Sequence, residues 1–390
     1  MTLHSRDKRY IVNTYNRLPI EIVKAKGSYI YDIDGEKYLD TFMGISVNNL
    51  GHNPDYIVDA IKNQLDKYSH VSNYFANEPA TKLAELLVEN SCAHQVFFTN
   101  SGTEATEAAL KLVKKYGKMQ GKKIILSANK SFHGRTTGSL ALTGQAKYQD
   151  SFRPLIEDIY HFDYNDIKSL ESVVNEDTLG VFIELVQGEG GVTAVTKEFI
   201  NRLVELRKQY GFLIIADEIQ TGLGRAGDLF AYEAYDFKPD LICLAKSLGG
   251  GLPLGGLLVS ENLSEVFQPG DHGTTFGGNP VSCAGGVAVL EKLLEPKFLD
   301  EIKIKGELIK SSLRKLQEKH PSKIKEIRCK GLMIGIELFE EGITLRNKAL
   351  KEENLLINIT SKNVIRLLPS LEITNEEIQT FIEKLDHIMS

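Results

Sequence analysis

Short apolar runs alternate with amphipathic stretches through the middle of the chain. Near-continuous apolar strands that are separated by helical stretches are typical of a mostly parallel sheet with both faces covered. The pattern therefore predicts an α/β fold. The predicted strands are Val96–Thr99, Lys123–Leu126, Val181–Val186, Phe212–Ala216, Leu241–Ala245 and Gly256–Val259.

Two helices are predicted from apolar residues at helical spacing. One has Leu83, Leu86 and Leu87 on a single face. The other follows the first strand and carries apolar residues at i, i+3, i+4 and i+7 from Ala109 to Tyr116. We expect this second helix to end at Gly117, because glycine is the usual residue just beyond a helix.

The two ends of the chain have a different pattern of polar and apolar residues. Residues 29–34 and 37–40 alternate polar and apolar around Asp34-Gly35, which predicts a β-hairpin. Beyond about residue 295, charged helical segments alternate with strands near Leu332–Glu337 and Val364–Leu368, and a final helix begins at Thr374. We expect residues 51–294 to form a large α/β domain, residues 295–390 a small α+β domain, and residues 1–50 a segment that joins the small domain.

Composition and charge narrow the class of protein. The formal net charge of −6 argues against a nucleic-acid-binding protein. No apolar run approaches the roughly 18 residues of a membrane span. Cys92, Cys243, Cys283 and Cys329 are far apart and form no CxxC pair, so we expect free thiols in a reducing compartment, by default the cytoplasm.

The segment Asn100–Glu104 joins a predicted strand to a predicted helix. Ser101 and Glu104 have the spacing of a capping box. One interpretation is only a well-capped helix. The other is an anion site, because free N–H groups and the helix dipole attract a phosphate and Gly102 allows close approach.

Two charged residues follow other strands. Asp217 comes directly after Phe212–Ala216, and Lys246 directly after Leu241–Ala245. Ligands of open α/β sheets bind beyond the carboxyl ends of the strands. Asp217 is therefore either a loop cap or the partner of a cofactor nitrogen, and Lys246 is either a solvated lysine or a desolvated amine that forms a Schiff base.

A fourth segment, Ser131–Arg135, follows the strand Lys123–Leu126. Phe132 and Arg135 are compatible with a core aromatic and a surface charge. They are equally compatible with an aromatic cover for a planar cofactor and a bidentate partner for a substrate carboxylate.

The stretch Gly222–Gly227 matches the G-x-G-x-x-G pattern of dinucleotide-binding dehydrogenases, the alternative class of enzyme. That motif requires a tight strand–turn–helix unit. Here Asp217 to Thr221 separate the strand from the glycines, and Asp228-Leu229-Phe230 opens no obvious amphipathic helix. The dehydrogenase interpretation is therefore disfavoured.

Taken together and in this order, the segments resemble the class III (ornithine-type) aminotransferases, a family of fold-type I pyridoxal-phosphate enzymes. The resemblance covers nearly the whole chain. The matching segments are Asn100–Glu104, Phe132–Thr136, Gln187–Gly191, Asp217–Gly222, Ala245–Gly251, His272–Pro280 and Val364–Arg366.

The resemblance implies a role for each matching residue. Lys246 would hold pyridoxal 5'-phosphate covalently and then move the proton, and Asp217 would pair with the ring nitrogen so that the ring draws electrons. The implied cofactor-binding residues are Ser101, Gly102, Thr103, Phe132, Asp217, Glu218, Ile219, Gln220, Lys246 and Thr275, and no metal is implied. Thr275 would come from the neighbouring subunit of a homodimer.

The resemblance also implies a ping-pong transfer of a terminal amino group to 2-oxoglutarate. N-acetylornithine is the implied donor, with ornithine, succinylornithine, succinyldiaminopimelate and 4-aminobutyrate as alternatives. The implied substrate-binding residues are Arg135, Thr274, Glu189 and Arg366. Glu189 would mask Arg366 while the donor, with one carboxylate, is bound, unless the two form a permanent structural ion pair.

Overall fold

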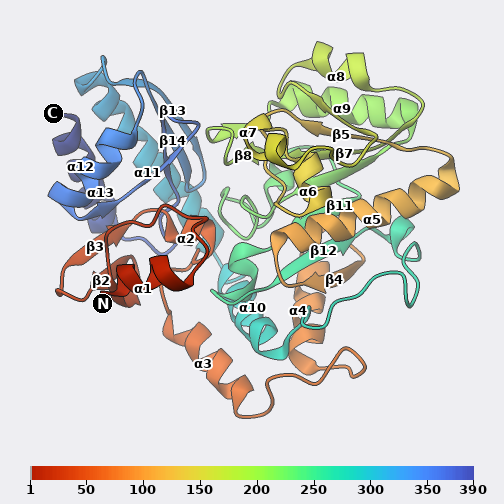
Figure 1. Cartoon of the computed structure of the whole chain (residues 1–390), viewed down its shortest axis with the longest axis horizontal. Coiled ribbons are helices and arrows are strands. Elements are labelled where there is room, and N and C mark those ends of the chain that lie inside the picture. Colours follow the sequence, from red (N-terminus) through yellow and green to blue (C-terminus); the bar gives the residue numbers. More distant parts are fainter. Residues whose placement is uncertain (1) are drawn as a thin grey trace.

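A seven-stranded sheet forms the centre of the fold in the computed structural model, which describes residues 2–390 (Figure 1). Its strand order is β4-β12-β11-β10-β7-β5-β6. Only β12 runs antiparallel to its neighbours, so the predicted mostly parallel sheet is confirmed. The bounds are β4 Gln95–Thr99, β5 Ile124–Ala128, β6 Ile159–Phe162, β7 Thr178–Glu184, β10 Leu213–Asp217, β11 Leu241–Leu244 and β12 Gly255–Val259.

The central strands are buried along their whole length. Every residue of β7, β10 and β11 is inaccessible to solvent or nearly so, as expected for strands with both faces covered.

The α-helices are α1 Leu3–Tyr10, α2 Met43–Ser46, α3 Asp55–Leu65, α4 Glu78–Glu89, α5 Gly102–Gln120, α6 Thr137–Leu142, α7 Ala146–Gln149, α8 Ile167–Val173, α9 Lys197–Tyr210, α10 Pro280–Leu293, α11 Phe298–Lys319, α12 Ile343–Glu353 and α13 Asn375–Met389. Short 3₁₀ turns are η1 Asp150–Phe152, η2 Ala231–Ala234, η3 Lys246–Gly249 and η4 Glu261–Leu263.

The predicted end of the helix after the first strand was wrong. Helix α5 continues through Gly117 to Gln120 and ends at Gly121, whose φ of 69° is left-handed. Gly117 is needed for packing instead, because a Cβ there would lie 2.3 Å from Leu179 Cδ2. Glycine therefore marks a close contact at one position and a helix end at the other, and the sequence pattern alone does not distinguish them.

The N-terminal hairpin lies against the C-terminal part of the chain. β2 (Tyr29–Asp32) and β3 (Lys37–Asp40) pair around Asp34-Gly35, and this confirms the predicted hairpin. β3 also pairs with β15, so the red and blue ends of the chain lie side by side in Figure 1. The remaining strands are β1 Ile22–Lys26, β8 Val186–Gln187, β9 Thr193–Ala194, β13 Ile324–Lys330, β14 Met333–Leu338, β15 Leu355–Leu356, β16 Asn358–Thr360 and β17 Val364–Leu367. The domain boundaries near residues 50 and 294 stay a prediction.

The register of the parallel strands brings three chain segments to one edge of the sheet. Asp217, the last residue of β10, is level with Glu184 at the end of β7 and with Cys243 near the end of β11. Lys246 follows two residues after β11. The chemistry-bearing residues therefore meet where the strands end. Among residues 2–390, no helix has both the length and the apolar character that a membrane crossing needs.

Candidate active site

A cavity of about 500 Å³ opens at this edge of the sheet. All four segments that the sequence marked as candidate ligand sites contribute to its lining, together with Glu189. The lining includes Ser101, Gly102, Thr103, Phe132, Arg135, Glu189, Asp217, Ile219, Gln220 and Lys246. The topology therefore places residues that are far apart in sequence, from Val47 to Leu254, around one volume.

The N-terminus of α5 forms one wall of the cavity. Ser101 Oγ accepts a hydrogen bond from the Glu104 N–H at 3.3 Å, and Glu104 Oε2 accepts one from the Asn100 N–H at 2.7 Å. The predicted cap exists, but Glu104 reaches back one residue further than a capping box requires. A Cβ on Gly102 would lie 2.9 Å from Ile219 Cδ1, so glycine is needed here for packing as well as for access.

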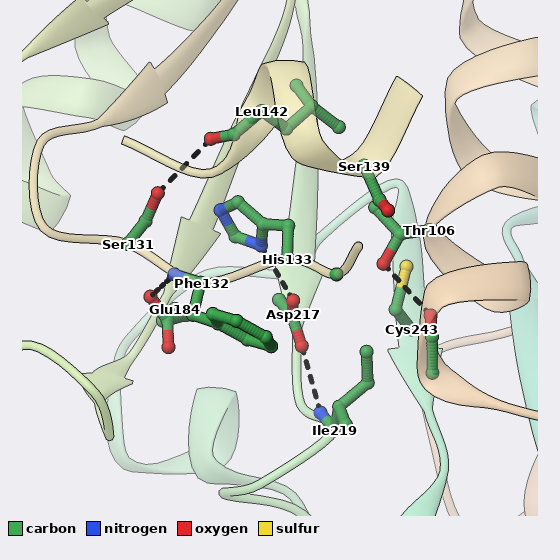
Figure 2. Close-up of polar contacts among 12 residues, drawn as sticks. Thr106, Ser131, Phe132, His133, Ser139, Leu142, Glu184, Asp217, Ile219 and Cys243 are labelled. Carbon is green, nitrogen blue, oxygen red and sulfur yellow. Dashed lines mark hydrogen bonds and ion pairs between the residues drawn. The ribbon is translucent and has the colours of Figure 1, made fainter. Parts of the chain in front are cut away.

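The carboxylate of Asp217 is buried and fixed from two sides, as Figure 2 shows. His133 Nδ1 donates to Asp217 Oδ2 at 2.7 Å, and the Ile219 N–H donates to Asp217 Oδ1 at 3.0 Å. His133 Nε2 is also buried and has no partner among residues 2–390. The sequence offered no role for His133 beyond its place beside Phe132, so this orienting residue was missed.

Phe132 is held at the cavity by Glu184, a second residue that sequence reasoning missed. The Phe132 N–H donates to Glu184 Oε2 at 3.1 Å (Figure 2). Burial, and then the negative charge of Asp217, raise the pKa of Glu184 well above its ordinary value. Both effects favour the protonated form of Glu184, which holds Phe132 beside Asp217.

Lys246 extends a half-buried side chain into the cavity. Its backbone has a φ of 52°, which is uncommon for a residue with a side chain. Its Nζ has neither a hydrogen bond nor an ion pair with any of residues 2–390. Burial, and then the positive charge of Arg366, lower the pKa of Lys246 to about 8. More of the amine is therefore unprotonated and nucleophilic near neutral pH than in an ordinary lysine.

Arg366 and Glu189 form an ion pair on another side of the cavity. Arg366 Nη1 lies 2.6 Å from Glu189 Oε1 and 3.3 Å from Gln220 Oε1. Asn358 Oδ1 accepts two further bonds from the Arg366 guanidinium. Burial would raise the pKa of Glu189, but the charge and hydrogen bond of Arg366 outweigh burial and lower it. Glu189 is therefore a carboxylate.

Arg135 is exposed at the cavity and makes no ion pair with any of residues 2–390. Its guanidinium carbon lies 4.0 Å from the centre of the Tyr148 ring. An arginine that is positioned by stacking and has unpaired donors suits a bidentate carboxylate ligand.

Four sequence-predicted residues do not line the cavity: Arg366, which reaches it only through its partner Glu189, and Glu218, Thr274 and Thr275. Glu218 points elsewhere, because its carboxylate accepts bonds from Thr221 Oγ1 and from the Ala231 and Tyr232 N–H groups. Its assignment as a cofactor ligand is therefore corrected to a structural one. Thr274 Oγ1 accepts a hydrogen bond at 3.0 Å from Nδ2 of Asn100, which lines the cavity. Thr275 is exposed and does not line this chain's own cavity.

The cavity suits pyridoxal 5'-phosphate. The buried, unpartnered amine of Lys246 would condense with the aldehyde, the α5 N-terminus would accept the phosphate, and Asp217 would pair with a protonated ring nitrogen. Phe132 would cover the ring. When bound, this group withdraws electrons from the carbon that carries the substrate amine.

Comparison with known proteins agrees with this site. Residues 10–389 match the family model for class-III aminotransferases. The chain is 44% identical, over 98% of both sequences, to an acetylornithine aminotransferase of Caldanaerobacter subterraneus subsp. tengcongensis. Among solved structures, an ornithine aminotransferase from Toxoplasma gondii has a TM-score of 0.94 and 30% identity, with 99% of this chain and 94% of that one covered. An N-acetylornithine aminotransferase from Stenotrophomonas maltophilia has a TM-score of 0.84 and 32% identity, with 99% and 98% covered.

The fold and site are those of a fold-type I pyridoxal-phosphate enzyme. Within that class, the chain belongs to the class III aminotransferases. The resemblance seen in the sequence is thereby confirmed, and the dehydrogenase alternative is dismissed.

Each part of the site then has a task in amino-group transfer. With the cofactor bound, Lys246 Nζ is placed to act as the base that would move the proton of the carbon carrying the amine. Asp217, held by His133 and the Ile219 N–H, would pair with the ring nitrogen and keep it protonated.

The lowered pKa of Lys246 predicts how cofactor binding depends on pH. The rate at which pyridoxal 5'-phosphate binds the cofactor-free protein should rise through about pH 8, because only the neutral amine attacks the aldehyde. The stability of the cofactor-free protein should rise over the same interval, from about pH 8 to 10.5, because there the unfolded chain binds the additional proton. Stopped-flow absorbance in the visible range measures the binding rate.

Glu189→Gln is the matched control for this prediction. The Glu189 carboxylate raises the Lys246 pKa, so its removal should move the midpoint of the rate profile to lower pH. Midpoints near the ordinary lysine value of 10.5 in both proteins would contradict the prediction.

Proposed function

We propose that this enzyme transfers the terminal amino group of N-acetylornithine to 2-oxoglutarate. The products are N-acetylglutamate 5-semialdehyde and glutamate, so the reaction belongs to arginine biosynthesis. The proposal is supported by full-length relatives at about 43% identity that carry the name acetylornithine aminotransferase, from Caldanaerobacter to Aquifex aeolicus. We also propose that it acts in the cytoplasm, in keeping with its four free thiols.

The observation that carries the choice of donor is the segment Met43–Val47. Val47 lines the cavity, and residues 43–46 contain no tyrosine that could bind a free α-amino group. The three acidic side chains of the lining already have partners: Asp217 pairs with His133, Glu189 pairs with Arg366, and Glu184 accepts the Phe132 N–H. A charged α-amino group would enter without a partner, which is strongly disfavoured, whereas an acetylated nitrogen is neutral.

Two arginines suit the two substrates. Arg135 is available to one carboxylate in both half-reactions. The second carboxylate of 2-oxoglutarate needs another cation, and Arg366 is the buried arginine whose Nη1 lies 2.6 Å from Oε1 of the lining residue Glu189. Exchange of one carboxylate for another on a single guanidinium keeps the charge paired throughout. We propose that Glu189 masks Arg366 until the acceptor binds.

We further propose a homodimer in which each cavity receives a threonine from its neighbour. Thr275 is exposed on its own chain and stands near large exposed aromatic side chains. Tyr74 is 95% exposed, Phe75 67% and Phe276 59%, and an exposed apolar patch of this kind is typical of a protein interface. Asn73 Nδ2 donates to the Thr274 carbonyl at 2.8 Å, which ties the two aromatic segments together.

The proposed donor predicts that the enzyme prefers N-acetylornithine to ornithine. The kcat/KM for N-acetylornithine should exceed that for ornithine by about tenfold or more, because a site without a partner for the charged amine rejects it. Steady-state assays with 2-oxoglutarate as acceptor give the ratio. An equal or higher value for ornithine would reject the proposed donor, while leaving the family assignment untouched.

The proposed switch predicts that Arg366→Ala damages one half-reaction. The half-reaction with 2-oxoglutarate should slow by about a hundredfold, because a buried partner of its second carboxylate is lost. The amine half-reaction should change by no more than about threefold, since Arg135 is intact. Stopped-flow absorbance of the cofactor follows each half separately. Arg328→Ala, which removes the β13 arginine that pairs with Glu326 and Glu337, is the control. Equal losses in both halves would favour a permanent ion pair.

The shared site predicts complementation between two defective chains. Lys246→Ala and Thr275→Ala homodimers should each be poorly active. In a mixed dimer, one cavity combines an intact Lys246 with an intact Thr275 from the partner subunit. After random exchange of subunits, activity should reach about a quarter of the wild-type value. If mixing restores no activity, Thr275 either serves its own chain or has no role.

A further inference from the structure

The glycine-rich stretch Gly222–Gly227 has no place in the chemistry described so far. It folds as a series of tight turns, with positive φ at Leu223 (55°), Gly224 (82°) and Gly227 (103°). A Cβ on Gly224 would lie 3.0 Å from Leu293 and from Leu371. The stretch is therefore packed between the segment after β10 and the C-terminal part of the chain. It carries a single charged residue, Arg225, which is completely buried.

Arg225 bonds to both ends of the chain at once. Nη1 donates to the Leu332 carbonyl at 3.0 Å and to the Pro369 carbonyl at 2.6 Å. Nε donates to Ser46 Oγ at 3.1 Å, and Nη2 donates to Asn49 Oδ1 at 2.7 Å. No carboxylate among residues 2–390 pairs with it. Burial lowers its pKa to about 9, so the guanidinium is charged at neutral pH.

The N-terminal partner of Arg225 is a strained turn. All four residues of α2 have positive φ, including Met43 (46°), Ile45 (61°) and Ser46 (66°), which carry side chains. Residues in this conformation persist only where their surroundings hold them. Asp40 Oδ1 accepts the Met43 N–H at one end of the turn, and Arg225 holds Ser46 at the other. Val47, at the cavity wall, follows directly.

The same guanidinium is connected to the residue beside Lys246. Asn49 accepts from Arg225 through Oδ1, and its Nδ2 donates to Ser247 Oγ at 3.1 Å. A continuous set of buried polar contacts thus runs from Leu332 and Pro369, through Arg225 and Asn49, to the backbone that carries the reactive amine. Buried networks of this kind hold a unique geometry when every member is satisfied.

We propose that Arg225 is a positioning residue that fixes the left-handed turn Met43–Ser46, and with it the donor-side wall of the cavity, against the C-terminal segment. Only a planar guanidinium has donors at enough angles to reach all four partners. This role of Arg225 goes beyond the aminotransferase activity. Only the kinetic test of the proposal rests on the proposed donor.

Arg225→Lys tests the proposal, with Arg225→Met as the neutral variant. Arg314→Met, on the exposed face of α11, is the matched control. The first measurement is amide hydrogen exchange of the cofactor-free protein, which needs no substrate. Exchange at residues 43–49 and 331–333 should quicken in both Arg225 variants by about tenfold or more, because hydrogen bonds to a charged group are lost. The control should match the wild type.

The second measurement separates positioning from a loss of folded enzyme. In Arg225→Lys the KM for N-acetylornithine should rise by about tenfold, while kcat per bound cofactor changes by less than about threefold. Ser46→Ala, which removes only the turn contact, should raise the same KM and quicken exchange at residues 43–49 but not at 331–333. It serves as the test if the Arg225 variants fail to fold.

Two results would overturn the proposal. One is unchanged exchange at residues 43–49 in the Arg225 variants. The other is a fall in kcat and in melting temperature at unchanged KM, as a purely structural arginine would give. If N-acetylornithine is not the donor, the exchange measurements still decide the role of Arg225, so the two failures are distinguishable.

Discussion

The active site depends on the burial of an amine without a partner. A charged ammonium that is removed from water and left unpaired is strongly disfavoured, so Lys246 responds by giving up its proton more readily than an ordinary lysine does. The neutral amine is what the covalent attachment of an aldehyde and the later proton transfer both require. The acidic groups around it follow the same rule in other ways. Asp217 is paired with His133, Glu189 is paired with Arg366, and burial raises the pKa of Glu184.

The fold supplies this arrangement through the direction of its strands. Because β7, β10 and β11 are parallel, their carboxyl ends lie at one edge of the sheet, where Glu184, Asp217 and Lys246 meet the N-terminus of α5. Other residues at the cavity come from elsewhere in the chain. Val47, which follows the left-handed turn, lines the cavity, and Arg366 on β17 pairs with the lining residue Glu189. Arg225 joins these N-terminal and C-terminal segments to the sheet.

Much of this site could be predicted from the sequence. Polar or charged residues follow directly after several apolar strands, and the packing of a buried strand does not require them there. Lys246, Asp217 and the Asn100–Glu104 cap became candidates in this way, and the resemblance assigned their roles and added Glu189 and Arg366. Contacts between distant segments were not readable. Nothing in the pattern paired His133 with Asp217 or Phe132 with Glu184, and Glu218 was assigned to the cofactor although it caps η2. One glycine misled, because Gly117 is a packing contact within α5 and not its end. Gly222–Gly227, for which the sequence already disfavoured a dinucleotide site, carries the buried Arg225.

The central claim is that the unpartnered amine of Lys246 holds the cofactor. It is tested most directly by reducing the cofactor-loaded protein with borohydride and mapping the modified peptide by mass spectrometry. Reduction makes the link between a lysine amine and pyridoxal phosphate permanent, so the bound residue is read without any assay of activity. The account predicts a single phosphopyridoxyl group, on Lys246, and disappearance of the visible absorbance. Modification of a different lysine, or none at all in protein saturated with pyridoxal 5'-phosphate, would contradict it.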